Sequence, residues 1–190
     1  MLLITVLGSV NLLAAVEEMN VAICNLGGVS ERVVSKAKAE VELVYRAAGV
    51  QIVWRDAAEF SASASREGAP WFFIRLRNDM PPRKVGPASL DVMGKAFVED
   101  DGGNVADAYF QAVQATSQLH DGNVGALLGL VIAHELGHLL LGPGHRRDGV
   151  MQAAWGKQQM DALRKRWLQF GKDCAERIRI RLDARTASVR

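Results

Sequence analysis

The chain is poor in cysteine and carries almost no excess charge. Two cysteines in 190 residues are far fewer than a disulfide-stapled miniprotein requires, and Cys24 and Cys174 could either pair in an oxidising compartment or remain separate thiols. The 23 basic and 21 acidic side chains leave a formal net charge of +2, which excludes a strongly charged polyelectrolyte. Disorder is excluded because 49% of the residues are hydrophobic. We therefore expect one globular domain, since chains of about 100 to 200 residues usually bury a single core.

Charge is also absent from the first 16 residues. The apolar run Leu2–Leu13 is followed by the small pair Ala14–Ala15, which resembles the hydrophobic region and cleavage site of a secretory signal peptide. The run is shorter than the roughly 20 residues of a membrane-spanning helix, so no stable membrane anchor is expected. No Lys or Arg precedes Arg32, so the usual basic region is missing and the segment could instead be a buried first helix. We expect a signal peptide at residues 1–15, a single domain at residues 16–190, and a secreted or extracytoplasmic protein.

The carboxyl-terminal segment, by contrast, is basic. From Arg164 to Arg190 there are nine basic and three acidic side chains, a local charge of 9 − 3 = +6. Such a segment could contact nucleic acid or an anionic surface, but a solvated helix face is the more common explanation. We expect no nucleic-acid partner, and the sequence indicates no oligomeric state.

The hydrophobic pattern of the first half alternates between strand and helix periods. Between residues 30 and 48 apolar side chains recur every three or four positions, which predicts a helix that Gly49 ends. Strands are predicted on both sides of it, and this order implies a parallel pair with a right-handed crossover. Residues 102–103 are expected to be a turn, and residues 163–178 to belong to one long helix. The predicted strands cover residues 20–25, 50–54, 71–76, 94–98 and 105–110.

The segment Val124–Leu141 has a different character. It is apolar on nearly all sides, which predicts a helix buried by the rest of the domain. The exceptions are His134, Glu135 and His138, and three polar groups inside such a helix are costly unless something satisfies them. This cost indicates a functional site.

The spacing of these three residues, HExxH, predicts a zinc site. Four helical residues turn about 400°, so the imidazoles of His134 and His138 lie on one face, about 6 Å apart along the axis. Zinc accepts neutral imidazole nitrogen, and a catalytic zinc holds three protein ligands and leaves one position for water. Glu135 lies beside the metal, where it could take a proton from that water and pass it to a leaving amine.

A third ligand could come from the turn that follows. The sequence Gly142-Pro143-Gly144 is expected to end the helix and turn the chain sharply. His145 follows directly, so its imidazole could swing back toward the metal. Otherwise it is an exposed turn residue.

HExxH, the glycine turn, His145 and Gly149-Val150-Met151 together resemble the signature of the metzincin metalloproteases, HExxHxxGxxH followed by a Met-turn. The chain is one residue longer than that signature between the second histidine and the glycine. The resemblance implies a zinc-dependent endopeptidase with one catalytic Zn²⁺, in which Met151 forms an apolar floor beneath the metal. The implied ligands are His134, His138 and His145, with Glu135 as general base and then general acid.

The third ligand has one alternative. Some similar metalloproteases use Asp at this position, so Asp148 could replace His145. A glutamate ligand is disfavoured, because no Glu occurs between Glu135 and Glu176.

The resemblance also implies the fold and the kind of substrate. We expect an α/β (α+β) domain: a small twisted mixed sheet with an antiparallel edge strand, a buried active-site helix, and a helical part from about residue 156. Gly94, Lys95, Ala96 and Phe97 are similar to the edge strand that forms the upper rim of the cleft in matrixin-like metzincins. An extended protein or peptide substrate would lie there as an added strand.

Two features of some metzincins are missing. Tyr45 and Tyr109 both precede the Met-turn, so no tyrosine follows it to stabilise an oxyanion, and zinc itself must polarise the carbonyl. No latency cysteine is visible, since Cys24 lies in the first predicted strand. Two alternatives stay open: a zinc hydrolase of small amides, and a zinc-stabilised binding module without turnover, in which Glu135 would have no purpose.

Overall fold

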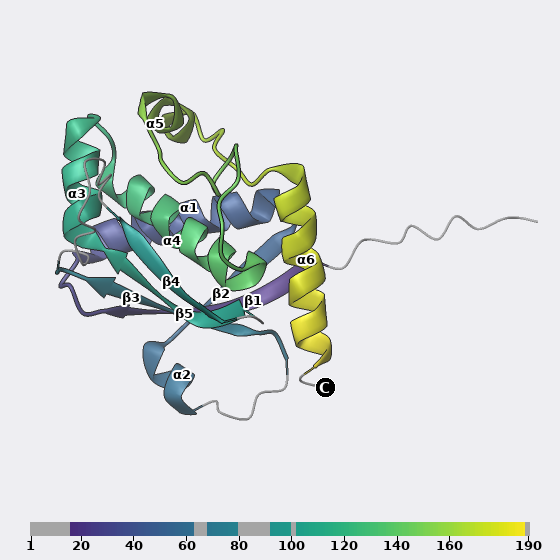
Figure 1. Cartoon of the computed structure of the whole chain (residues 1–190). Helices are drawn as coiled ribbons and strands as arrows, with labels where there is room; N and C mark the ends of the chain where they lie inside the picture. The colour runs from purple at the N-terminus through teal and green to yellow at the C-terminus, as the bar shows by residue number, and fades with distance from the viewer. Residues whose placement is uncertain (1–15, 63–67, 80–91, 100–101, 189–190) are drawn as a thin grey trace, which may run out of the picture.

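The computed structural model describes residues 16–62, 68–79, 92–99 and 102–188. Within these ranges the strands form one sheet, and the two longest helices lie side by side against it (Figure 1). The elements are β1 (Glu17–Asn25), α1 (Glu31–Ala47), β2 (Val50–Arg55), α2 (Ala57–Ala62), β3 (Trp71–Arg77), β4 (Gly94–Glu99), β5 (Gly102–Tyr109), α3 (Phe110–Leu119), α4 (Val124–Leu141), α5 (Lys157–Arg164) and α6 (Lys172–Ala187).

The sheet is mixed, as the sequence predicts. Its strand order is β2-β1-β3-β5-β4. The pairs β1–β2, β1–β3 and β3–β5 are parallel, whereas β4 runs antiparallel to β5 at the edge. The expected fold class, an α/β domain with an antiparallel edge strand, is therefore confirmed.

One face of the sheet packs on α1 and α4. In β3 the residues alternate in burial, and Phe72, Ile74 and Leu76 are fully buried on this face. The two helices approach each other closely, because Gly129 of α4 has no side chain: a β-carbon there would lie 2.5 Å from the carbonyl oxygen of Ala37 in α1. This close packing fixes the position of α4.

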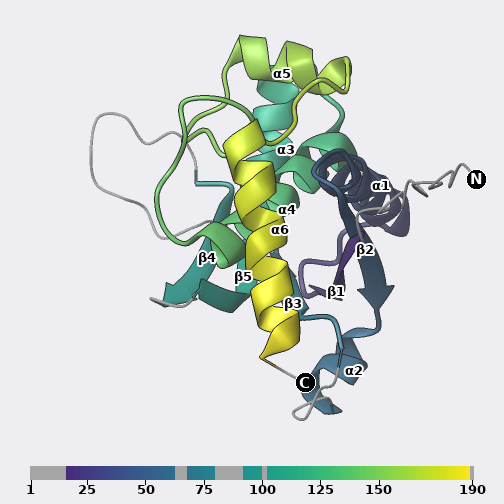
Figure 2. The same cartoon turned by 90° about the vertical axis from the view of Figure 1, so that its right-hand side faces the viewer.

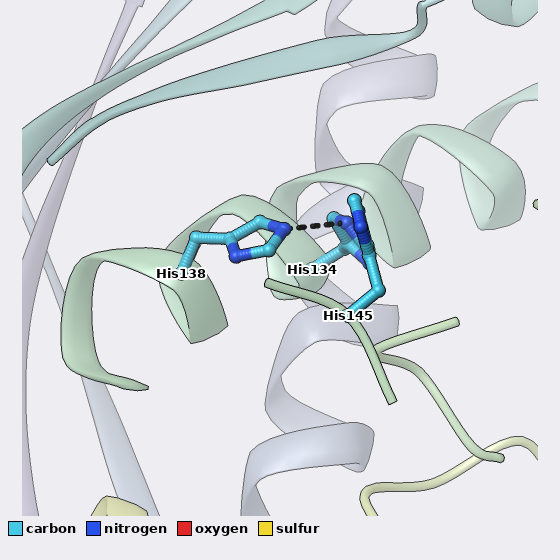
Figure 3. Close-up of side chains that lie close together, drawn as sticks. All are labelled: His134, His138 and His145. Carbon is cyan, nitrogen blue, oxygen red and sulfur yellow. Dashed lines mark hydrogen bonds between the residues drawn. The ribbon is translucent and has the colours of Figure 1, made fainter. Parts of the chain in front are cut away.

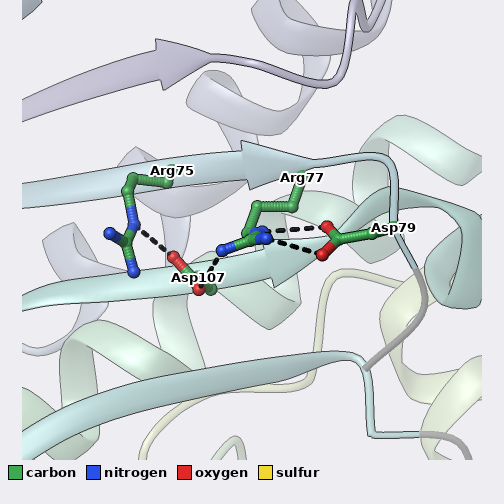
Figure 4. A network of polar contacts seen from close by, with 4 residues as sticks. All are labelled: Arg75, Arg77, Asp79 and Asp107. Carbon is green, nitrogen blue, oxygen red and sulfur yellow. Dashed lines mark hydrogen bonds and ion pairs between the residues drawn. The ribbon is translucent and has the colours of Figure 1, made fainter. Parts of the chain in front are cut away.

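The opposite face of the sheet carries a polar network. Asp107 on β5 is 2% exposed and accepts a hydrogen bond from Arg75 Nε on β3 at 2.5 Å (Figure 4). Arg77 bridges Asp107 and Asp79. The two guanidinium groups satisfy the buried carboxylate, which would otherwise be costly in the sheet.

Helix α4 has the limits that its sequence predicts. The Asn123 side chain accepts a hydrogen bond from the Ala126 N–H and so caps the first turn. Gly142 ends the helix with a φ of 84°, a conformation that favours glycine. The helix is long and apolar enough to cross a membrane, but 94% of it is buried inside the domain, which is typical of a core helix.

The carboxyl-terminal part differs from the prediction. Instead of one long helix there are two, α5 and α6, and Arg166 between them has a φ of 58°. Trp167, which lies within the helix predicted for residues 163–178, is 72% exposed. The reason is that the linking segment binds the preceding loop through its backbone: the Gln169 carbonyl accepts from the Val150 N–H at 3.0 Å.

Two smaller predictions were also wrong. Gly102 and Gly103 belong to β5 rather than to a turn, and α3, which begins directly after β5, was not predicted.

Cys24 and Cys174 are both free thiols. The predicted signal peptide, residues 1–15, lies outside the described residues.

Most of the basic segment forms α6, which lies on the surface of the domain (Figure 2), and two arginines of this helix have partners in other elements. Arg179 of α6 donates to the carbonyl of Ala48 at the end of α1, at 2.8 Å. Arg185 donates to the carbonyl of Leu139 in the last turn of α4, at 2.9 Å. A cation at a helix C-terminus satisfies free carbonyls and opposes the helix dipole. The helix continues to Ala187.

Candidate metal centre

His134 and His138 lie one turn apart on α4, and their rings are nearly perpendicular, with their Nε2 atoms directed at each other (Figure 3). The distance between the two Nε2 atoms is 3.0 Å. On the other side of each ring, Nδ1 contacts a backbone carbonyl: Val150 O at 2.7 Å from His134, and Gly142 O at 3.2 Å from His138. A carbonyl oxygen only accepts, so both Nδ1 atoms carry the hydrogen.

These contacts leave the Nε2 lone pairs of His134 and His138 directed at one point. Burial lowers the pKa of His134 to about 4 and also lowers that of His138, so both rings are neutral at pH 7. In a neutral imidazole with hydrogen on Nδ1, Nε2 is an acceptor. Two acceptors this close repel each other unless a cation lies between them. The pair is therefore arranged to bind a cation.

His145 joins this pair from the loop after α4. Its ring centroid is 5.3 Å from that of His134 and 4.9 Å from that of His138. One nitrogen from each of the three rings lies within 4.8 Å of the others. The first two rings are buried and the third is exposed, so the cluster opens to solvent on the side of His145.

Asp148, the alternative ligand, lies elsewhere. A β-carbon on Gly171 would be 3.3 Å from its carboxylate, so Asp148 faces the start of α6. Among the described residues, the group that could hold a metal contains the three histidines without Asp148. The geometry thus favours His145 over Asp148 as the third metal ligand.

The loop from Gly142 to Met151 turns back under α4. Arg146 N–H donates to the carbonyl of Met151 at 2.8 Å and closes the loop. Gly149 has a φ of 68°, and a β-carbon there would lie 2.4 Å from the Gln169 carbonyl oxygen. Only glycine fits both the conformation and the space. The close approach brings Val150 O to His134.

Met151 lies against α4 at Gly137, the residue before His138. It is 1% exposed, and a β-carbon on Gly137 would lie 2.5 Å from its Sδ atom. The glycine within HExxH therefore makes room for the methionine. This position is compatible with the apolar floor that the resemblance implies.

Glu135 is buried beneath the edge strand β4. A β-carbon on Gly94 would lie 2.5 Å from its Oε1 atom, so Gly94 is needed for this contact. Burial raises the pKa of Glu135 to about 8, although the Ala96 backbone N–H acts in the opposite direction. Lys95 and Phe97 are exposed and contact each other, with Nζ 4.9 Å from the ring centroid. Of the four predicted rim residues, Gly94 and Ala96 thus reach Glu135.

No protein-family model and no curated protein matches the chain. Among solved structures it is similar to archaemetzincin from Methanopyrus kandleri, with a TM-score of 0.59 over 87% of this chain and 96% of that one. The sequence identity is 16%, so the similarity concerns the fold. The domain therefore shares the fold of archaemetzincin.

Within this fold the three histidines suit zinc. Catalytic zinc sites use three protein ligands, and ligating histidines commonly donate their other N–H to a backbone carbonyl. The carbonyls of Val150 and Gly142 accept these hydrogens here. The donor set and its hydrogen bonds therefore fit the ion.

Trp155 is a neighbour of the cluster that the sequence analysis missed. Its ring is perpendicular to that of His134, with centroids 5.3 Å apart. Its Nε1 atom is buried and has no hydrogen-bond partner within the described ranges. No spacing rule identifies such a residue, because the contact depends on how the loop after Met151 returns to α4.

Proposed function

We propose that the protein is a zinc-dependent endopeptidase with one catalytic zinc ion. The supporting observation is the cluster of His134, His138 and His145, with two Nε2 atoms 3.0 Å apart, next to a buried carboxyl group. A zinc ion held there would lower the pKa of a coordinated water to about 7 and polarise the carbonyl of the bond to be cleaved. A purely structural site would not need Glu135.

Glu135 is the group that moves the proton in this proposal. It takes a proton as water adds to the carbonyl carbon and delivers it to the leaving nitrogen, so one water is consumed for each peptide bond broken. Its contact with Gly94 places this carboxyl directly under β4. An extended peptide along the outer edge of β4 would have its carbonyl groups near that carboxyl.

The test uses the full chain loaded with one equivalent of zinc and a mixed peptide library analysed by mass spectrometry. We expect internal cleavage that a chelator abolishes and zinc restores. Glu135→Ala should keep the zinc and lower the rate by about 10²- to 10⁴-fold. Glu176→Ala, a change at an exposed glutamate of α6, is the matched control and should cleave normally.

Other outcomes select the alternatives. Hydrolysis of small amides without cleavage of peptides would identify a different zinc hydrolase. Stoichiometric zinc without any hydrolysis would indicate a zinc-stabilised binding module. A cleavage rate that is unchanged in Glu135→Ala would contradict the proposed mechanism.

We also propose that the protein acts on protein or peptide substrates outside the cytoplasm. The support is the signal-like sequence at residues 1–15. Expression of the full chain in a bacterial host, followed by amino-terminal sequencing of the exported protein, tests this. Retention of the intact chain in the cytoplasm would contradict it.

A further inference from the structure

The loop after α4 places an arginine directly beside the third histidine of the cluster. His145 forms the side of the cluster that is open to solvent (Figure 3), and Arg146 follows it with an exposed side chain. The backbone of Arg146 is held at its N–H, which donates to the Met151 carbonyl at 2.8 Å, and by an isolated β-bridge to Gln152. The side chain therefore starts from a defined point of the loop.

The guanidinium of Arg146 turns back toward the cluster. Its Nη1 atom donates to the carbonyl oxygen of His145 at 3.3 Å. Burial is the main cause of the lowered pKa of His138, and the charges of His145 and Arg146 lower it further, so the guanidinium is near enough to act on this ring. Arg146 thus adds a positive charge at the open side of the metal centre.

Among the described residues, no acid forms an ion pair with Arg146. Asp148 is the one acid of the loop, and it faces the start of α6. Glu135 is buried under β4, where it contacts Gly94. The bond to the His145 carbonyl uses a single N–H of the guanidinium, which has five. Most of its donors are therefore available to a ligand.

This arrangement favours a negatively charged group on the substrate. The planar guanidinium can bind a carboxylate through two parallel N–H groups, and a positively charged cleft concentrates anionic ligands. Lys95, which is exposed on the rim strand β4, carries the same sign as Arg146. A cationic group of the substrate would be repelled by these charges, and an uncharged group would leave the guanidinium to water.

We propose that Arg146 is a specificity-determining residue that binds a carboxylate of the substrate close to the bond to be cleaved. The substrate class is a peptide with an aspartate or glutamate near that bond, and a free carboxyl terminus offers the same chemistry. This inference rests on the proposed peptidase activity. It adds which peptides the site accepts.

The experiment measures binding separately from turnover, with four peptides of otherwise identical, uncharged sequence. Three are blocked at both ends and carry Glu, Gln or Lys at the centre, and the fourth is the Gln peptide with a free carboxyl terminus. Calorimetry with zinc-loaded Glu135→Ala, in which cleavage is slowed, gives the affinities. We expect the Glu peptide to bind about tenfold more tightly than the blocked Gln peptide, and the Lys peptide to bind most weakly. A gain confined to the fourth peptide would assign the carboxylate to the chain terminus.

Three variants test whether Arg146 causes the preference. Arg146→Gln should reduce the difference between the Glu and Gln peptides to less than about twofold. Arg146→Lys keeps the charge without the planar fork and should retain part of the difference. Arg147→Gln removes the same charge from the next position, which is also exposed, and as the matched control should leave the difference at about tenfold. All three should still bind one zinc ion, since each keeps the three histidines. With Glu135 intact, kcat/KM for the peptides should follow the same order.

Several results would overturn the proposal. One is equal affinity for the Glu peptide and both Gln peptides, and another is no binding of any peptide at millimolar concentration. A preference that survives Arg146→Gln, or that Arg147→Gln reduces equally, would assign it to the overall charge of the surface instead. Failure of the peptidase proposal looks different: a wild type that binds the Glu peptide preferentially but cleaves none of the four contradicts the peptidase activity alone.

Discussion

Lowering the pH from 8 to 6.5 should stabilise the metal-free protein, because Glu135 is buried. In the folded state its pKa is raised from 4.5 to about 8 by burial. The unfolded chain releases this proton near pH 4.5, whereas the folded chain keeps it until about pH 8. Between these values the folded state binds more protons, so its stability falls as the pH rises.

The magnitude follows from the same pKa. The stability that the proton provides is complete below pH 4.5 and is lost as the pH rises through about 8. Each pH unit well below the folded pKa corresponds to about 1.4 kcal/mol, and the slope halves at the pKa itself. From pH 8 to pH 6.5 the contribution of Glu135 to the free energy of unfolding should therefore rise by about 1.6 kcal/mol.

His134 sets the lower limit of this pH window. Burial lowers its pKa from 6.5 to about 4, so below pH 6.5 the unfolded state binds a proton that the folded state does not bind. Stability then falls as the pH falls, which opposes the effect of Glu135. Well above pH 6.5 both states of His134 are neutral, and the part that the histidines contribute near pH 6.5 is shared by the wild type and Glu135→Gln, so it cancels when the two proteins are compared.

The assay is urea unfolding at 25 °C in the presence of a chelator, for the wild type and Glu135→Gln. Glutamine has the same shape but does not titrate, so the variant should lack this part of the slope. The reasoning is refuted if the unfolding free energies of the two proteins change in parallel between pH 6.5 and pH 8, to within about 0.5 kcal/mol.

Three further predictions concern the metal loop and α6. His145→Ala should weaken zinc binding by about 100-fold or more, and Asp148→Asn should leave it nearly unchanged, in competition with a chromogenic chelator; equal losses would contradict the assignment. At Gly149 the φ is 68° and the backbone of Gln169 lies close, so Gly149→Ala should lower the free energy of unfolding by about 2 kcal/mol and Tm by roughly 4–8 °C. A change in Tm below about 1 °C would be inconsistent with this contact. Arg185→Met should destabilise the protein by about 1–3 kcal/mol, because carbonyls near the end of α4 lose their donor, whereas Arg181→Met at an exposed position should have little effect on unfolding.

Helix α4 could be predicted from the sequence because several local signals agree there. The apolar run begins after Asn123, a good capping residue, and ends at Gly142 before a proline. The strands could be predicted because alternating apolar and polar residues, or a dense run of apolar residues, can be recognised from a few consecutive positions. Each of these features depends on residues near in sequence.

The division of the carboxyl-terminal helix could not be predicted in this way. Leu163, Phe170, Cys174 and Ile178 are buried, so the helical spacing is real at most positions. The interruption between α5 and α6 arises because Gln169 and its neighbours bind the backbone around Gly149, which is distant in sequence. The contact of Trp155 with His134 was missed for the same reason.

The extra residue in the metzincin-like signature is accommodated at the end of α4. Inside a helix one insertion would rotate everything after it by about 100°. Here the helix extends to Leu141, and Gly142 and Gly144, with φ values of 84° and 100°, redirect the chain before His145. The loop is then fixed by the Arg146 N–H to Met151 carbonyl bond rather than by the phase of the helix. Two glycines that tolerate left-handed backbone thus allow His145 to reach the other histidines despite the altered spacing.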